Sequence, residues 1–161
     1  MDRRWVINAS PLIVLAKVGQ VALLPELATE LVIPRGVVEE IEAGSLDDPA
    51  RLWLADEGAE YVREIEKEEP LVAAWDLGKG ESAVLTWAYQ NAGFEAIVDD
   101  RAARNCGNTL RLPVRGTLGV ILLAKQEGKI EQVAPVFEQL QDAGLRIDAA
   151  VLAKALQLAG E

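Results

Sequence analysis

The chain of 161 residues contains no histidine and only one cysteine, Cys106. The lack of histidine excludes a histidine general base, histidine metal ligands and a Ser-His-Asp triad. Zinc sites built from cysteine and histidine are excluded as well. A single cysteine cannot form an internal disulfide, which agrees with a reducing cytoplasm. Any metal ion must therefore be held by oxygen atoms, which points to Mg²⁺ or Mn²⁺.

Long apolar runs and an excess of positive charge are also missing. No uninterrupted stretch of roughly 18 apolar residues is present, so we expect no membrane span. The segment 1–5 lacks the apolar core of a signal peptide, and we expect a cytoplasmic protein. The net charge of −10 argues against tight unassisted binding to a nucleic-acid backbone. It still permits phosphoryl chemistry, because a divalent cation reverses the local sign of a carboxylate site.

What the chain does contain is an alternation of short apolar strands with helices. Half of its residues are hydrophobic, enough for one core. Strands are predicted near residues 5–7, 31–33, 61–65, 96–98 and 112–114. Helices are predicted near residues 11–18, 23–28, 37–43, 49–57, 81–92, 101–106 and 118–125. Further helices are predicted over 130–161, with a break near Gly144. This order predicts an α/β fold, a three-layer α/β/α sandwich with a central parallel sheet, in a single domain over 1–161.

The first strand leads into a turn of polar and rigid residues. Val6 and Ile7 suit a buried strand, Ser10 is a good N-cap, and Pro11 fits the first position of a helix. Asn8 then lies at the carboxyl end of the strand, where ligands collect in open α/β sheets. The alternative for Asn8 is a turn amide that bonds the backbone.

Several carboxylates follow strands or begin helices. Glu81 lies within about 60° of three apolar residues on its helical wheel; the alternative is a half-exposed residue that complements the helix dipole. Glu40 lies about 105° from the centre of its helix's apolar face, and Glu39 about 155°, so Glu40 taken alone fits a rim residue better than a ligand. Asp99 and Asp100 end a strand together, and Asp100 also suits the N-cap of the next helix.

These oxygen-bearing side chains come from separate parts of the chain but are expected at one edge of the sheet. Adjacent carboxylates repel each other unless a cation lies between them. An oxygen-only Mg²⁺ or Mn²⁺ site suited to phosphoryl chemistry would form if four of these side chains converge, namely Asn8, Glu40, Glu81 and Asp99.

Four pieces of the sequence, spread over residues 6–129, carry a resemblance to a known family. They are V-I-N-A-S-P-L-I-V-L-A-K, I-P-R-G-V-V-E-E-I, L-G-K-G-E-S-A-V-L, and I-V-D-D-R-A-A-R followed by V-R-G-T-L-G-V-I-L-L-A-K. Their order and spacing resemble PIN domains of the prokaryotic toxin type, a subgroup described as predicted nucleic-acid-binding. The resemblance implies a metal-dependent ribonuclease with acidic residues that bind Mg²⁺ or Mn²⁺. It also implies single-stranded RNA as substrate and pairing with an antitoxin protein.

The resemblance assigns roles to individual residues. Glu40, Glu81 and Asp99 match the family's acids, with Asp100 beside the last. Two hydroxyl residues, Ser10 and Thr117, match positions that orient water or phosphate. Asn8 departs from the pattern, because the family carries aspartate there; an amide oxygen can coordinate a metal but brings no charge.

Three hypotheses follow in decreasing order. The first is an active ribonuclease, with metal ligands Asn8, Glu40, Glu81 and Asp99. The second is a degenerate PIN module that binds RNA or a protein without cutting, which Asn8 and the acidic net charge favour. The third is a phosphoryl-transfer receiver of another α/β fold, which explains Asp99 and Asp100 but not the G-E-S-A piece. The apolar helices after Gly116 offer a face for a homodimer.

Overall fold

The computed structural model describes residues 2–161. Its strands are β1 (Arg4–Ile7), β2 (Glu30–Pro34), β3 (Val62–Arg63), β4 (Phe94–Ile97) and β5 (Val114–Arg115). They form one sheet in the order β3-β2-β1-β4-β5, and every neighbouring pair is parallel. The predicted central parallel sheet is confirmed.

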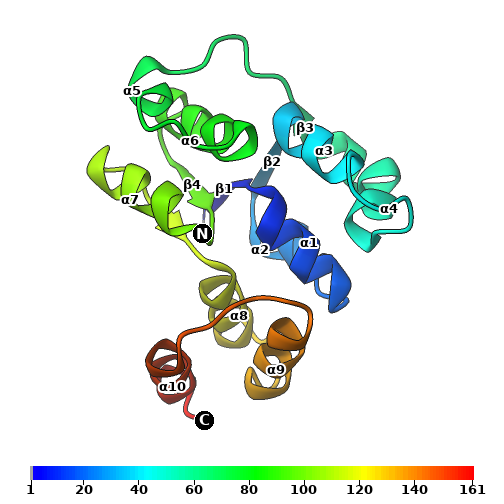
Figure 1. Ribbon diagram of the computed structural model, residues 1–161. Helices are drawn as coiled ribbons and strands as arrows, with labels where there is room; N and C mark the ends of the chain where they lie inside the picture. The colour runs from blue at the N-terminus through cyan, green and yellow to red at the C-terminus, as the bar shows by residue number, and fades with distance from the viewer. Residues whose placement is uncertain (1) are drawn as a thin grey trace.

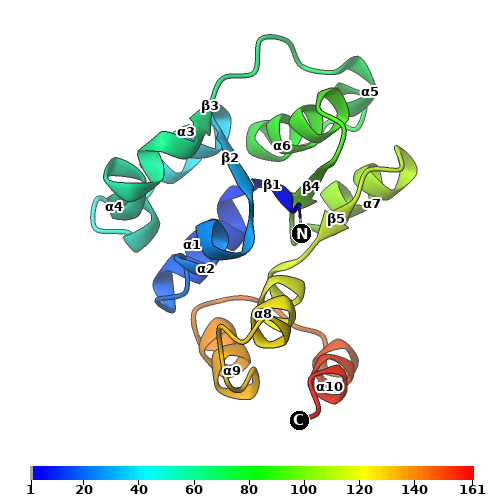
Figure 2. The same ribbon diagram turned by 180° about the vertical axis from the view of Figure 1, so that it is seen from behind.

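Helices flank both sides of this sheet (Figures 1 and 2). One side carries α1 (Ala9–Lys17), α2 (Leu23–Leu27), α3 (Arg35–Glu42) and α4 (Pro49–Ala55), followed by the short 3₁₀ helix Glu57–Tyr61. The other side carries α5 (Pro70–Ala73), α6 (Lys79–Gln90) and α7 (Arg101–Thr109). A further group, α8 (Thr117–Gln126), α9 (Ala134–Asp142) and α10 (Ala149–Leu158), gathers at one end of the molecule. The three layers agree with the predicted sandwich.

Strand β1 lies at the centre of the sheet. It pairs with β2 through Arg4 and Glu30 and with β4 through Ile7 and Ile97. Trp5, Val6 and Ile7 have no exposed surface. A strand covered on both faces is expected to be continuously apolar, and this one continues directly into the residues of the candidate site.

The predicted cap of the first helix is wrong. Helix α1 begins at Ala9, with Asn8 rather than Ser10 at the N-cap. Asn8 keeps an extended backbone (φ −83°, ψ 166°) while its carbonyl already accepts a bond from the N–H of Leu12. The strand therefore runs into the helix without an intervening turn. Pro11 still fits, because N–H groups of the first helical turn need no partner inside the helix.

Two predicted strands are shorter or shifted. The strand expected over 61–65 is reduced to β3. The strand expected over 112–114 begins only at Val114, because the N–H of Leu112 donates to Gly107 O at the end of α7 (2.8 Å) and Pro113 has no N–H to offer. The cap predicted at Asp100 is confirmed, since its Oδ2 accepts from the N–H of Ala103 (3.0 Å).

One carboxylate holds the group α8–α10 together. Glu161 Oε2 accepts from Lys125 Nζ of α8 (2.7 Å) and from the N–H of Val133 (2.8 Å), and Oε1 accepts from the N–H of Ala134 at the start of α9 (3.0 Å). These bonds, led by that from Lys125, lower the pKa of Glu161 to about 2. The chain also turns at Gly144 (φ 112°), where a break was predicted. None of the helices within residues 2–161 has the length and apolar character needed to cross a bilayer.

Candidate active site

Asn8 supplies a buried oxygen at the centre of the sheet edge. Its N–H donates to Ile97 O of β4 (3.1 Å), which fixes the residue between two strand ends. The side chain is buried, and Oδ1 has no hydrogen-bond partner in the part of the chain that the structure describes. A buried acceptor left without a partner costs about 1–3 kcal/mol. The unpartnered oxygen therefore marks a place where a ligand would be stabilising.

Glu40 of α3 and Asn8 meet at Gly80 of α6. A Cβ atom built on Gly80 would lie 2.9 Å from Glu40 Oε1 and 3.2 Å from Asn8 Oδ1. The side-chain oxygens of Glu40 and Asn8, which come from different parts of the chain, thus both lie close to Gly80. Only glycine leaves this space open without displacing one of them. The structure thus brings two of the four predicted site residues, Asn8 and Glu40, to the same glycine.

Glu81 follows Gly80 in the first turn of α6 and is half-buried. Its Oε2 lies close to Gly78, 2.7 Å from where a Cβ of that residue would stand. The pKa of Glu40 is raised, first because packing removes water from its carboxyl group and second because Glu81 is negatively charged nearby. Glu40 is exposed as a whole residue, yet its Oε1 lies against α6. The two carboxylates therefore belong to one electrostatic site.

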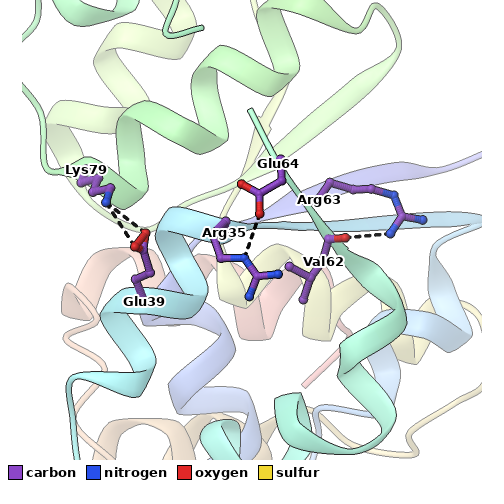
Figure 3. A network of polar contacts seen from close by, with 6 residues as sticks. All are labelled: Arg35, Glu39, Val62, Arg63, Glu64 and Lys79. Carbon is purple, nitrogen blue, oxygen red and sulfur yellow. Dashed lines mark hydrogen bonds and ion pairs between the residues drawn. The ribbon is translucent and has the colours of Figure 1, made fainter. Parts of the chain in front are cut away.

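The N-terminal halves of α3 and α6 are held side by side. Gly36 of α3 lies against α6, where a Cβ would stand at the ordinary contact distance of 3.6 Å from Ala83 Cβ. Lys79 Nζ pairs with Glu39 Oε1 at 3.0 Å across the two helices (Figure 3). Exposed ion pairs contribute about 0–1 kcal/mol. The pairing therefore orients α3 toward α6 more than it stabilises the fold.

A second ion pair fixes α3 to the chain beyond β3. Arg35 Nε lies 3.1 Å from Glu64 Oε1, and the neighbouring Arg63 donates from a guanidinium nitrogen to the carbonyl of Val62 at 2.8 Å (Figure 3). Two ion pairs of α3, Lys79–Glu39 and Arg35–Glu64, therefore hold the side of the helix that faces away from its buried residues. Glu40 is left facing Gly80.

Asp99 is engaged by Thr117, at the start of α8. The Thr117 N–H donates to Asp99 Oδ1 (2.8 Å), and the Thr117 hydroxyl donates to Oδ2 (2.5 Å). Thr117 is fully buried. A carboxylate has about four acceptor positions, so these two bonds leave capacity for another ligand. Asp99 nevertheless has a clear structural role in fixing α8.

The remaining predicted residues lie at the margin. Asp100 is exposed and caps α7, and Ser10 is exposed in the first turn of α1. Their catalytic and orienting roles stay predictions. Within residues 2–161, no group of three or more histidine, cysteine or acidic side chains is arranged to hold a metal ion. The oxygens placed at Gly80 are one amide oxygen, from Asn8, and one carboxylate oxygen, from Glu40, with the charge of Glu81 nearby.

Sequence reasoning missed Gly80 as part of the site. Gly80 lies in the G-K-G-E segment of the sequence. Its role depends on contacts with Glu40 of α3 and with Asn8 after β1, which are distant in sequence and cannot be predicted from the local pattern. The position of Asn8 supplied the only available signal, because a polar residue directly after a buried strand is expected to face a neighbour at the sheet edge.

Comparison with known proteins places the fold. The model of the DUF3368 family, described as a PIN domain, matches residues 4–161. The chain therefore belongs to this PIN-domain family, and its fold is of the nuclease type. Among solved structures, the crystal structure of PAE2754 from Pyrobaculum aerophilum is 15% identical, with a TM-score of 0.43 over 66% of this chain and 87% of that one. No curated protein matches the chain.

Proposed function

We propose that this protein is a metal-dependent endoribonuclease of the PIN type that hydrolyses single-stranded RNA. The observation that carries the proposal is the unpartnered Asn8 Oδ1 beside Glu40 Oε1 over Gly80. A carbonyl oxygen without a donor next to a carboxylate is unfavourable for hydrogen bonding but suits a hard cation. Membership of the PIN family supports the same chemistry.

The residues present fit Mg²⁺ or Mn²⁺. Asn8, Glu40 and Glu81 would hold the ion, and Asp99 has acceptor capacity left to join them. A bound divalent ion supplies an activated water and stabilises the leaving oxygen of a phosphodiester. The chain's own part is to supply negative charge from Glu40 and Glu81 and a neutral oxygen from Asn8. Thr117 keeps the Asp99 carboxylate in one orientation.

A second candidate is a degenerate PIN module that binds RNA or a protein without cutting it. Two observations favour it. Asn8 replaces a charged ligand with an amide, and Asp99 already accepts two hydrogen bonds from Thr117. An antitoxin partner and a homodimer remain part of either proposal. The exposed Val151 and Leu158 of α10 support an apolar face in the C-terminal group of helices.

Cleavage of single-stranded RNA in Mn²⁺ tests the first candidate. Wild type should cut, and Glu81→Gln should reduce the rate by at least about 100-fold, because a charged group of the site is lost. Asn8→Asp should raise the rate by restoring a carboxylate. The exposed Glu138→Gln in α9 is the matched control and should leave the rate unchanged.

The same assay separates the two candidates. Cleavage by Asn8→Asp alone would identify a degenerate module that one substitution revives. An equal rate in wild type and Glu81→Gln would remove Glu81 from the site. Absence of Mn²⁺-dependent cleavage in both wild type and Asn8→Asp would show that the ribonuclease proposal is wrong.

A further inference from the structure

A cleft of about 760 Å³ is lined by residues of α7, the start of α8 and the segment 145–151 before and within α10. Four arginines line it: Arg101, Arg104, Arg115 and Arg146. The whole chain has 16 lysines and arginines and a net charge of −10. Four guanidinium groups around one cleft therefore oppose the overall negative charge of the chain, which on its own repels anions.

One wall of the cleft is a single face of α7. Arg101, Arg104, Asn105 and Asn108 stand at positions i, i+3, i+4 and i+7, which lie on one side of a helix. This face extends over about 10 Å along the helix. All four side chains carry N–H donors, and none is a carboxylate. The face therefore presents a row of donors to whatever enters the cleft.

The carboxylates that line the cleft already accept hydrogen bonds. Glu95 Oε1 accepts from Arg115 Nε (2.8 Å) and from the indole of Trp5 (3.0 Å). Asp99 accepts from Thr117, as described above. Asp148 caps α10 by accepting from the N–H of Ala150 (2.9 Å).

The outer arginines keep their donors available. Between residues 2 and 161, no carboxylate forms an ion pair with Arg101 or Arg146, and both residues are exposed. Guanidinium groups in this state match phosphate oxygens, which they bind through two parallel N–H bonds. The charge and the donor geometry both favour an anionic ligand with phosphate groups.

The wall formed by α8 and residues 145–151 is mainly aliphatic apart from Arg146 and Asp148. It includes Leu118, Leu145, Ile147 and Val151, and no aromatic side chain is among the lining residues. Proteins that read bases of single strands stack them on aromatic rings. This cleft is instead suited to the sugar-phosphate backbone, which carries no sequence information.

The cleft reaches one residue of the candidate active site, Asp99, beside Gly116. A Cβ built on Gly116 would lie 2.9 Å from a guanidinium nitrogen of Arg104 and 3.0 Å from Asp99 Oδ1. Arg104 is held there by a bond to the carbonyl of Val98, at 3.2 Å. An anion bound along α7 would thus reach the edge of the sheet at Asp99.

We infer that this cleft binds the phosphate backbone of single-stranded RNA and leads the strand along α7 toward the carboxylate site. The inference rests on the proposed function for its substrate, but it concerns binding rather than cleavage. Arg101 and Arg146 contact phosphates from opposite walls. Arg104 positions the strand next to Asp99. Binding is expected to tolerate changes of base sequence and to weaken with added salt.

Binding of a short unstructured RNA, labelled at one end, tests the inference by fluorescence anisotropy in EDTA. The double variant Arg101→Gln/Arg146→Gln should bind about tenfold more weakly than wild type, and its slope of log K against log salt should fall by about 1.4. The matched control is Lys129→Gln/Lys154→Gln. It removes the same charge from exposed residues outside the cleft and should bind within about twofold of wild type.

Two outcomes would overturn the inference. The first is equal weakening in both double variants, which would indicate a general charge effect. The second is arginine-dependent binding of polyglutamate without binding of RNA, which would indicate an acidic protein partner. Because EDTA prevents metal-dependent cleavage, RNA binding can succeed while the ribonuclease proposal fails. Conversely, cleavage that is unaffected by Arg101→Gln/Arg146→Gln would reject the cleft and leave the ribonuclease proposal standing.

Discussion

Two carboxylates of this protein, Glu40 and Glu161, stand in opposite environments. Glu161 accepts three hydrogen bonds, from Lys125 and two backbone N–H groups, and its pKa falls to about 2. Glu40 has no hydrogen bond from a donor within residues 2–161, loses water to packing and lies near Glu81, and its pKa is raised. The fold stabilises the charge of the first and opposes the charge of the second.

The difference separates a structural carboxylate from a candidate functional one. Glu161 connects α8, α9 and the end of α10, far from the sheet edge. Glu40 meets the unpartnered Asn8 Oδ1 at that edge. A group whose charge is disfavoured in the metal-free protein gains most from a cation. Groups with perturbed pKa values gather at functional sites for this reason.

Gly80→Ala should have the largest effect of the variants described here, because it should lower the affinity of the candidate site at Glu40 for Mn²⁺. The added methyl would occupy the space between Glu40 Oε1 and Asn8 Oδ1, so affinity for Mn²⁺ should fall at least about tenfold. Stability without metal should be kept or rise by up to about 1 kcal/mol, because alanine favours the helix and the end of Glu40 can swing away. Titration calorimetry measures the affinity, and thermal melting measures the stability.

Gly36→Ala provides the matched control for this variant. Gly36 is also the second residue of its helix, and its Cβ would make ordinary contacts at 3.6 Å with no oxygen of the site. It should bind Mn²⁺ as wild type does. Unchanged affinity in Gly80→Ala would show that the space over Gly80 is no metal site.

Glu161→Gln should lower the thermal midpoint by a few degrees at neutral pH. The charge-assisted bond from Lys125 is lost, and the two backbone donors meet a weaker acceptor. Because the folded pKa is depressed, the wild-type advantage is present above the unfolded value of about 4.5 and is lost as the pH falls toward 2. Melting curves between neutral pH and pH 2 should therefore converge. A gap that persists in acid would mean that packing, and not charge, explains the loss.

Glu40→Gln should have the smallest effect, and with the opposite sign. A raised folded pKa means that the native state binds more protons, so wild-type stability falls as the pH rises above 4.5. In EDTA at neutral pH the variant should be more stable by less than about 1 kcal/mol, because the residue is exposed and partly screened. Below pH 4.5 the two proteins should melt alike. A less stable variant at neutral pH would show that the Glu40 charge is compensated by a donor.

Much of the fold could be predicted from local patterns. Apolar runs such as Trp5–Ile7 and the cap at Asp100 depend on residues close in sequence, and the structure agrees with both. Short strands at the edges of the sheet are harder to predict from local patterns. The pairing of β5 depends on how α7 ends at Gly107 and Leu112, which overrides the apolar pattern of the segment. The cap at Ser10 failed because the strand enters the helix directly.

The candidate site was predictable only in part. Helical wheels placed Glu81 on the apolar side of its helix and Glu40 at the border of the other, and family resemblance connected them. The space over Gly80 arises where β1, α3 and α6 meet, which no single segment reveals. The arginine face of α7 has a readable period. Its partner wall, around Arg146, comes from a segment some 40 residues later and could not be paired with it beforehand.

The position of β1 has a consequence for the newly synthesised chain. Its second neighbour in the sheet is β4, and the paired residues Trp5 and Glu95 are separated by 90 residues. At about 5–20 residues per second, a ribosome needs roughly 5 to 18 s to make that stretch. Until β4 has been synthesised, the N–H of Asn8 has no Ile97 carbonyl to bind, and the sheet edge that Gly80 packs against is incomplete. The sheet edge that fixes Asn8 is therefore complete only after Ile97 of β4 has been synthesised.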